Sequence, residues 1–160
     1  MFNKKRKLCV VITARASYSR CKSLLRAIKN SHEFTLDIVL TASALLDKYG
    51  KIGDQIQRDG FTVYARAHSL IETDGDPCSM GLTTGTGIIQ LTQIFNKMQP
   101  SAVITIADRY ETIATAISAT YSGIPLIHIQ GGEITGNIDE KVRHAVSKFS
   151  DYHFPATRNA

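Results

Sequence analysis

Short apolar runs alternate with amphipathic stretches along most of this 160-residue chain. The apolar runs lack strict alternation, which is typical of strands buried on both faces of a parallel sheet. Between them, apolar residues recur three and four positions apart, as on a helix with one buried face. The pattern predicts strands at residues 8–13, 36–40, 61–64, 102–106, 125–129 and 152–155. It predicts helices at 17–30, around 45–58, after a glycine-rich loop at 75–87, at 111–121 and at 139–149.

Strands separated by helices fold as a doubly wound, Rossmann-like α/β layer with a parallel sheet. The length suits one such domain, covering residues 1–160, and the sequence contains no repeat or obvious linker. Ligands of open parallel sheets bind outside the carboxyl ends of the strands, near the point where strand order reverses. The loops of interest are therefore 13–20, 107–111 and 130–140.

Charge and cysteine content narrow the function classes. The formal net charge is +5, but four of the 19 basic residues lie in the run Lys4–Lys7, which leaves 15 basic against 14 acidic residues elsewhere. With no basic face interleaved with aromatics, we expect no nucleic-acid partner. Three cysteines without a CxxC pair argue against a disulfide framework or a zinc site. The apolar run LCVVITA is too short for a membrane span, so we expect a soluble, cytoplasmic protein without membrane contact.

The loop TARASYSR after the first strand lacks the G-x-G-x-x-G fingerprint and carries Arg15 and Arg20 instead. Guanidinium groups at a strand end suit an anionic or polyhydroxylated ligand. Equally, both could be surface arginines beside a helix that Ser17 or Ser19 caps. The glycine-rich run 81–87 has no Lys-Ser or Lys-Thr ending, which favours a flexible loop entering a helix over a phosphate loop.

Carboxylates gather in the two later loops. Asp108 ends an apolar strand and Glu111 follows three residues later, an arrangement that predicts a capping box. The same Asp108 could face the cleft, and amide contacts there would favour its charged form. In QGGEITGNIDE, Gly131 and Gly132 would let the backbone turn sharply and approach a ligand closely. Asn137 with Glu140 predicts a second capping box.

The last predicted helix has a buried stripe, formed by Val142, Ala145, Val146 and Phe149. This stripe leaves Asp139, Arg143 and His144 to other faces of the helix. Capping explains Asn137, but it explains Glu133 and Asp139 less well. Several carboxylates and arginines at one cleft are what proton transfer at carbon, or glycosidic cleavage, would require.

Three segments together, ITARASYSR, DRYE and IPLIHIQGGEITGNIDEKVRHAVSK, resemble the hydrolysing UDP-N-acetylglucosamine 2-epimerases. The branch that feeds sialic-acid and related nonulosonate synthesis is the most similar, and the resemblance extends from the first strand to about Thr157. It implies the N-terminal half of a two-domain GT-B-type fold with the active site between the domains. Because the second domain would follow Ala160 and hold most of the nucleotide site, residues 1–160 alone are expected to be inactive.

The resemblance also implies a reaction. The family removes the C2 proton of the sugar and expels UDP to give a 2-acetamidoglycal, and water then adds to give free N-acetylmannosamine. The implied partner is UDP-N-acetylglucosamine or a UDP-diacetamido sugar, without a metal or cofactor, in a dimer or tetramer. A GT-B glycosyltransferase acceptor domain and a non-catalytic module that binds nucleotide sugars are the alternatives.

Matching the motifs residue by residue implies a set of site residues. These are catalytic Asp108, Glu133 and Asp139, with Arg15, Arg20, Gln130 and Arg143 binding substrate. Gln130 is a departure, since many members carry glutamate at the third position of HIxGGE and an amide cannot act as a general base. Glu133 is the nearest acid that could take over, and Gln130 could bind the substrate instead. Ala107 also departs, standing where a glycine is common before Asp108.

Overall fold

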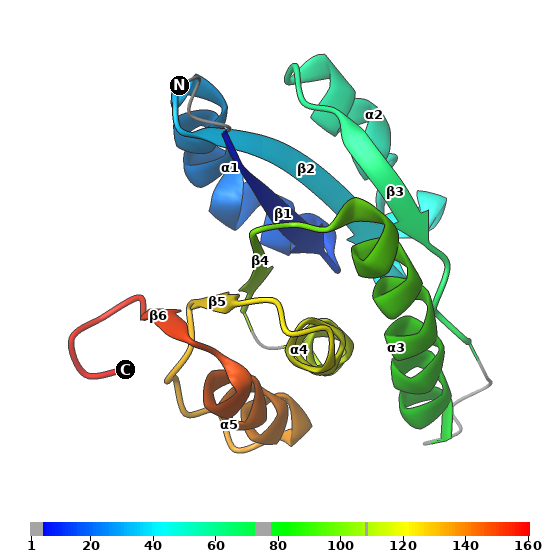
Figure 1. Ribbon diagram of the computed structural model, residues 1–160. Helices are drawn as coiled ribbons and strands as arrows, with labels where there is room; N and C mark the ends of the chain where they lie inside the picture. Colours follow the sequence, from blue (N-terminus) through cyan, green and yellow to red (C-terminus); the bar gives the residue numbers. More distant parts are fainter. Residues whose placement is uncertain (1–4, 73–77, 108) are drawn as a thin grey trace.

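The computed structural model describes residues 5–72, 78–107 and 109–160. A single parallel sheet has the strand order β3-β2-β1-β4-β5-β6 and is covered by helices on both faces (Figure 1). Its strands are β1 (Arg6–Ile12), β2 (Phe34–Thr41), β3 (Val63–Ala67), β4 (Ala102–Ile106), β5 (Leu126–Ile129) and β6 (Tyr152–Phe154). The helices are α1 (Arg15–Asn30), α2 (Ile52–Arg58), α3 (Cys78–Met98), α4 (Thr112–Tyr121) and α5 (Ile138–Phe149), with short 3₁₀ turns at η1 (Ala42–Leu45) and η2 (Asp47–Tyr49). The doubly wound α/β fold predicted from the sequence is confirmed.

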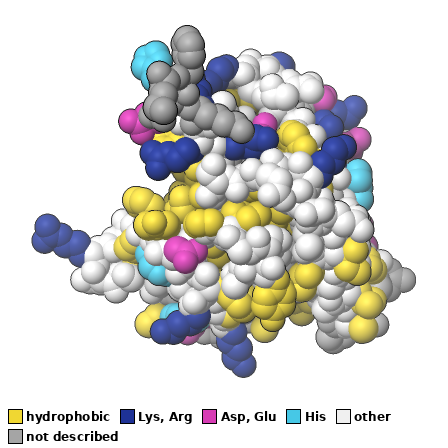
Figure 2. Space-filling view, viewed as in Figure 1, with side chains coloured by type: hydrophobic (Ala, Val, Ile, Leu, Met, Phe, Trp, Pro, Cys, Tyr) yellow, Lys and Arg dark blue, Asp and Glu magenta, His cyan; other side chains and the backbone are white. Residues whose placement is uncertain are grey.

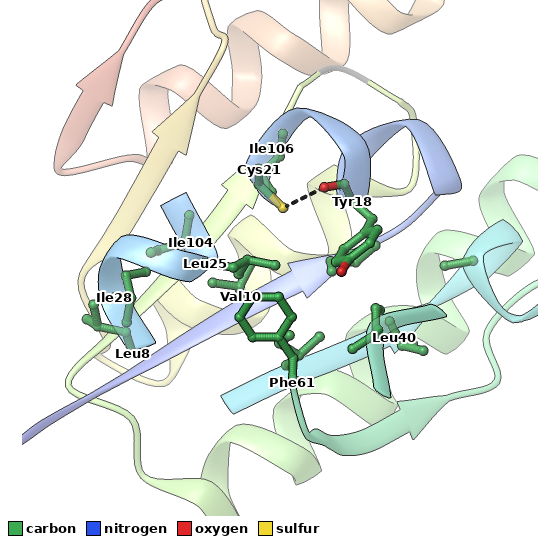
Figure 3. Packing of buried hydrophobic residues seen from close by; sticks show 14 of the residues in the cluster. Leu8, Val10, Tyr18, Cys21, Leu25, Ile28, Leu40, Phe61, Ile104 and Ile106 are labelled. Carbon is green, nitrogen blue, oxygen red and sulfur yellow. Dashed lines mark hydrogen bonds between the residues drawn. The ribbon is translucent and has the colours of Figure 1, made fainter. Parts of the chain in front are cut away.

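Successive residues of β1 point to opposite faces of the sheet, and both faces are buried. Val10 joins a cluster beneath α1 and α2, where it packs with Leu25 and Phe61 (Figure 3). Cys9 and its alternate neighbours join a second cluster beneath α3, α4 and α5. Burial on both faces is the reason that the strands show no polar alternation in the sequence.

Strand order reverses at β1, with β2 and β3 on one side and β4, β5 and β6 on the other. The chain leaves β1 towards α1 on one face and leaves β4 towards α4 on the opposite face (Figure 1). The two loops therefore separate at the carboxyl ends of these neighbouring strands. A doubly wound sheet opens its binding crevice at this point.

The prediction of a loop at 81–87 is wrong, because these residues lie within α3. For one of these glycines, Gly87, the packing of α3 explains why the residue is glycine. A Cβ atom added there would lie 3.0 Å from the Cβ of Ala114, so glycine lets α3 pack closely on α4. The remaining part of that loop, residues 75–77, lies outside the described residues. The predicted helix around 45–58 is also divided, into η1, η2 and α2.

Large apolar side chains are partly exposed at several places on the surface. They are Tyr64, Leu82, Ile89, Tyr121, Ile134, Ile138, Tyr152 and Phe154. On the face shown in Figure 2, basic side chains are dispersed among acidic and apolar ones rather than gathered into one field. In the part of the chain that the structure describes, no helix combines the length and apolar character needed to cross a bilayer.

Candidate functional site

A groove of about 930 Å³ lies at the carboxyl ends of the strands. Its walls come from the loops after β1, β2 and β3, from the start of α3 and from the loop between β4 and α4. Arg15, Ser43, Ile71, Arg109 and Tyr110 are among its lining residues. The groove therefore lies at the crevice that the strand order predicts.

Arg15 is the first residue of α1, and its exposed side chain lines the groove. The helix N-cap is Ala14, which offers no side-chain hydrogen bond. Uncapped amides and a guanidinium at one helix start favour an anionic ligand. The predicted caps are wrong, since Ser17 is buried within the helix and the hydroxyl of Ser19 donates to the Arg15 carbonyl at 3.4 Å. Arg20 is exposed on α1 and does not line the groove.

The loop between β4 and α4 forms another wall. Asp108 lies outside the described residues, so its predicted place in the cleft stays a prediction. Ala107 has a φ of +65°, a conformation that suits glycine and accounts for the family's usual residue there. The predicted capping box is wrong in its register, because α4 begins at Thr112 and Glu111 is itself the N-cap residue, without a side-chain capping bond.

Glu111 is a buried carboxyl at the base of this wall, with its side chain 2% exposed. Nε of Arg109 donates to both of its carboxylate oxygens at 3.1 Å. Burial raises the pKa of Glu111, the charge of Arg109 lowers it, and the charge of Asp139 raises it further. The sequence interpretation treated Glu111 as a cap only. The arginine two positions earlier in DRYE is the signal that could have identified the pair.

Asp139 reaches this same wall from the first turn of α5. Its Oδ1 atom accepts a hydrogen bond from the backbone N–H of Tyr110 at 3.1 Å, across 29 residues of sequence. Burial raises the pKa of the Tyr110 phenol, and the nearby Glu111 and Asp139 carboxyl groups raise it further. Two acids from different elements therefore lie beside one groove-lining loop.

Gln130 directly follows β5 and has a φ of +62°, as Ala107 directly follows the neighbouring β4 in the same left-handed conformation. Its N–H donates to the carbonyl of Phe154 at 2.9 Å, which fixes its backbone at the edge of the sheet. Its Oε1 atom is buried and has no hydrogen-bond partner among the described residues. A buried amide oxygen without a partner is costly, and such cases are found at functional sites.

His128 was missed by the sequence interpretation, although a histidine in an apolar strand was its signal. It is buried, and its Nε2–H donates to the carbonyl of Ala107 at 3.0 Å. In the neutral ring Nδ1 then accepts from the hydroxyl of Ser147, 3.1 Å away. His128 thus joins the ends of β4 and β5 to α5.

The two glycines after Gln130 serve different purposes. Gly132 has a φ of +89°, which confirms the predicted sharp turn. At Gly131 the backbone lies close to other parts of the protein, because an added Cβ would lie 2.7 Å from Nδ1 of His128 and 2.9 Å from the hydroxyl of Ser147.

Arg143, which was predicted to bind substrate from a helix face outside the buried stripe, is fully buried. Loop 133–137 folds over it, so that Nη1 donates to the backbone carbonyl of Glu133 and Nη2 lies 3.3 Å from Oγ1 of Thr135. Glu133 itself is exposed. Arg143 therefore holds the loop, and of the described candidate residues Arg15 alone lines the groove.

The cap predicted at Asn137 is confirmed. Its Oδ1 accepts from the N–H of Glu140 at 3.2 Å. The Glu140 carboxylate reaches further back than a capping box does, accepting from the N–H groups of Thr135, at 2.7 Å, and Gly136. These amides hold the pKa of Glu140 below its usual value. Loop 133–137 is thus held at its first residue by Arg143 and at Thr135 and Gly136 by Glu140.

A doubly wound parallel sheet with a groove at its switch point defines a Rossmann-like class of α/β domain. The sequence model of the UDP-N-acetylglucosamine 2-epimerase family matches residues 26–160. The chain belongs to this family, as its motifs predicted.

Curated relatives agree with the family. The chain is 35% identical over 155 residues to a UDP-N,N'-diacetylbacillosamine 2-epimerase (hydrolyzing) of Legionella pneumophila, covering 95% of this chain and 40% of that protein. It is 30% identical over 157 residues to a UDP-N-acetylglucosamine 2-epimerase of Neisseria meningitidis, covering 98% and 40%. The chain therefore spans about 40% of the length of these relatives.

Solved structures share the fold. A UDP-N-acetylglucosamine 2-epimerase superposes with a TM-score of 0.84 at 20% identity, covering 98% of this chain and 43% of that one. The Neisseria meningitidis enzyme bound to UDP-GlcNAc gives 0.80 at 22% identity, covering 96% and 40%. MurG of Acinetobacter baumannii gives 0.64 at 10% identity, covering 97% and 43%.

Proposed function

We propose that this chain is the N-terminal domain of a hydrolysing 2-epimerase, which converts a UDP-N-acetylhexosamine into UDP and the free 2-epimerised sugar. Family membership and the hydrolysing relatives support the proposal. The observation that carries it is the hydrogen bond from Tyr110 to Asp139, because it holds a carboxylate against the loop that lines the groove.

The proposed reaction has two halves. A base takes the proton from C2 of the sugar, the C1–O bond breaks, and UDP leaves with the bonding electrons. The 2-acetamidoglycal then takes hydroxide from water at C1 and a proton at C2 on the opposite face. Each half requires an acid–base group held within hydrogen-bond reach of C2.

We assign Asp139 and Asp108 to this proton transfer, the first from its position beside the groove and the second from its family motif. Gln130 can hold the substrate but cannot carry its proton. Its Oε1 atom, which has no partner in the described part of the chain, suits a ligand N–H or hydroxyl donor. Glu133 stays a candidate acid. Its exposed position supports a role only if the loop approaches a bound substrate.

The test is turnover by the full-length protein in heavy water. Either UDP-N-acetylglucosamine or a UDP-diacetamido sugar should release UDP together with free sugar carrying deuterium at C2. Product without deuterium at C2 would contradict the mechanism. UDP formed without free sugar, and only in the presence of an acceptor, would indicate glycosyl transfer instead.

Glu133→Gln then decides how the departure at Gln130 is met. A loss of kcat of roughly 100-fold, the scale of a lost acid–base group, would assign Glu133 the missing acid's role. A mild loss would assign it to loop structure. We also propose a homo-oligomer, as the family resemblance implies, and light scattering of the full-length protein tests it.

A further inference from the structure

The segment that follows β6 packs on the loop that follows β5. The backbone turns back after β6 (Figure 1), and Ala160 comes to lie against Gly132. A Cβ atom added at Gly132 would lie 3.1 Å from Cα and 3.2 Å from Cβ of Ala160, and its nearest neighbour would be the carbonyl carbon of the same residue. Residues 151–159 are exposed, whereas Ala160 is half-buried. Ala160 therefore has a defined place on this loop.

The same part of the chain also holds Gln130. The carbonyl of Phe154, at the end of β6, accepts a hydrogen bond from the backbone N–H of Gln130 at 2.9 Å. Residues 154–160 thus contact the loop twice, through this hydrogen bond and through the close packing at Gly132. Two consecutive glycines follow Gln130, and glycine has more backbone freedom than any other residue. Contacts with neighbouring segments must therefore fix where this backbone lies.

We propose that residues 155–160 are a positioning segment for Gln130 and act on it through the backbone at Gly132. The proposal rests on the proposed function, in which the Gln130 amide holds the nucleotide sugar. Oε1 of Gln130 is buried and has no partner among the described residues, so the backbone decides where that atom lies. A backbone that is restricted before the substrate arrives loses less entropy on binding.

Gly132→Ala in the full-length protein tests the contact, and Gly136→Ala is the matched control. Both glycines lie in the same stretch of loop and have a positive φ, +89° and +75°, so alanine is similarly strained at each. Only the Cβ added at Gly132 meets Ala160, because nothing lies within 4 Å of the one added at Gly136. A difference between the two variants therefore reports the contact with Ala160.

Amide hydrogen exchange at Gln130 measures the contact independently of any reaction. Its N–H is bonded to Phe154, and displacement of the loop should open that bond more often. Exchange should be about 10-fold faster in Gly132→Ala than in Gly136→Ala. Equal exchange in the two variants would overturn the proposal. If Gly132→Ala does not fold, Ala160→Val presses on the same contact from its other side, and unchanged exchange there would be equally decisive against it.

The kinetics of UDP release connect the contact to the substrate. Gly132→Ala should raise KM by about 10-fold relative to Gly136→Ala and change kcat by less than about 3-fold, because Gln130 binds substrate but carries no proton. A variant that is only less stable would lower kcat, since fewer molecules are active, and leave KM unchanged. In the background of Gln130→Ala, the effect of Gly132→Ala on KM should disappear. A lower kcat at constant KM, or additive effects on KM, would contradict the positioning role.

Failure of this proposal is distinct from failure of the proposed function. A wild-type protein that releases no UDP would overturn the proposed reaction, while faster exchange in Gly132→Ala would keep the positioning of Gln130. UDP release together with equal exchange in the two glycine variants would keep the reaction and remove the role of residues 155–160.

Discussion

His128 and Gly131 determine how closely the end of β5 packs on α5. The imidazole and the Ser147 hydroxyl occupy the space that a side chain at position 131 would need. The requirement for glycine at that position is therefore steric and internal to the protein. A substitution there disturbs the loop that carries Gln130 and Glu133.

Gly131→Ala should destabilise the protein by about 1–3 kcal/mol, the usual cost of overpacking. The added methyl would meet Nδ1 of His128 at 2.7 Å. Denaturant unfolding measures the change. Gly85→Ala is the control, because its added Cβ meets nothing within 4 Å inside α3 and should stabilise by about 0.5–1 kcal/mol. Equal behaviour of the two variants would contradict the steric argument.

Asp139→Asn should lower kcat by roughly 100-fold or more in the full-length protein, because the amide keeps an acceptor for the Tyr110 N–H but cannot take a proton. Asp108→Asn should have a similar effect. Asp54→Asn, on the exposed side of α2, serves as the control. UDP release at saturating substrate measures kcat. Near-normal rates in both site variants would remove the proposed acid–base pair.

At the scale of elements, the start of α5 organises the loop that precedes it. Asn137 caps the helix, Glu140 binds two loop amides, and Arg143 binds the loop from beneath. Asp139 lies in the same helical turn and points to the neighbouring loop between β4 and α4. One helix start therefore fixes two loops relative to each other.

Glu140 makes this arrangement sensitive to acid. Its folded pKa lies below the ordinary 4.5 because the Gly136 and Thr135 amides stabilise the carboxylate. Its contribution to stability is therefore complete above pH 4.5 and is lost as the pH falls through the lowered folded value. Thermal unfolding of wild type and Glu140→Gln should differ at neutral pH and converge in acid. Parallel curves at every pH would contradict the prediction.

At the scale of the whole molecule, the carboxyl ends of the strands form a groove that is lined partly by charged side chains. Arg15, Lys48 and Arg109 are the basic residues among its lining. Arg15 and Arg109 come from segments on the two sides of the switch point. Strand order thus places together residues that are 94 positions apart in the sequence.

Residues 1–160 by themselves should bind UDP weakly and release none from a nucleotide sugar. The groove is open to solvent and presents the carboxyl ends of one sheet only, which leaves the substrate partly hydrated. Comparing UDP release by this chain and by the full-length protein, at equal molar concentration, measures the difference. Steady release by residues 1–160 would show that one domain is sufficient.

Much of the architecture follows from local sequence pattern. Continuous apolar runs indicate strands buried on both faces, and helical spacing indicates the layers that cover them. The boundaries of β4 agree with the sequence prediction, and the Asn137 cap was predictable because capping involves residues three apart. The rule that ligands of open parallel sheets bind at the carboxyl ends of the strands directed attention to the edge of the sheet where the groove lies.

Tertiary structure decided the remainder, because it depends on contacts between distant segments. Nothing local shows that loop 133–137 covers Arg143, that Glu111 becomes buried against Arg109, or that Asp139 binds the Tyr110 amide. The glycines at 81–87 look like a loop by propensity, yet they lie within α3, where Gly87 packs against α4. Periodicity therefore determined the layers, whereas the burial and partners of each charged side chain were determined only when the layers packed together.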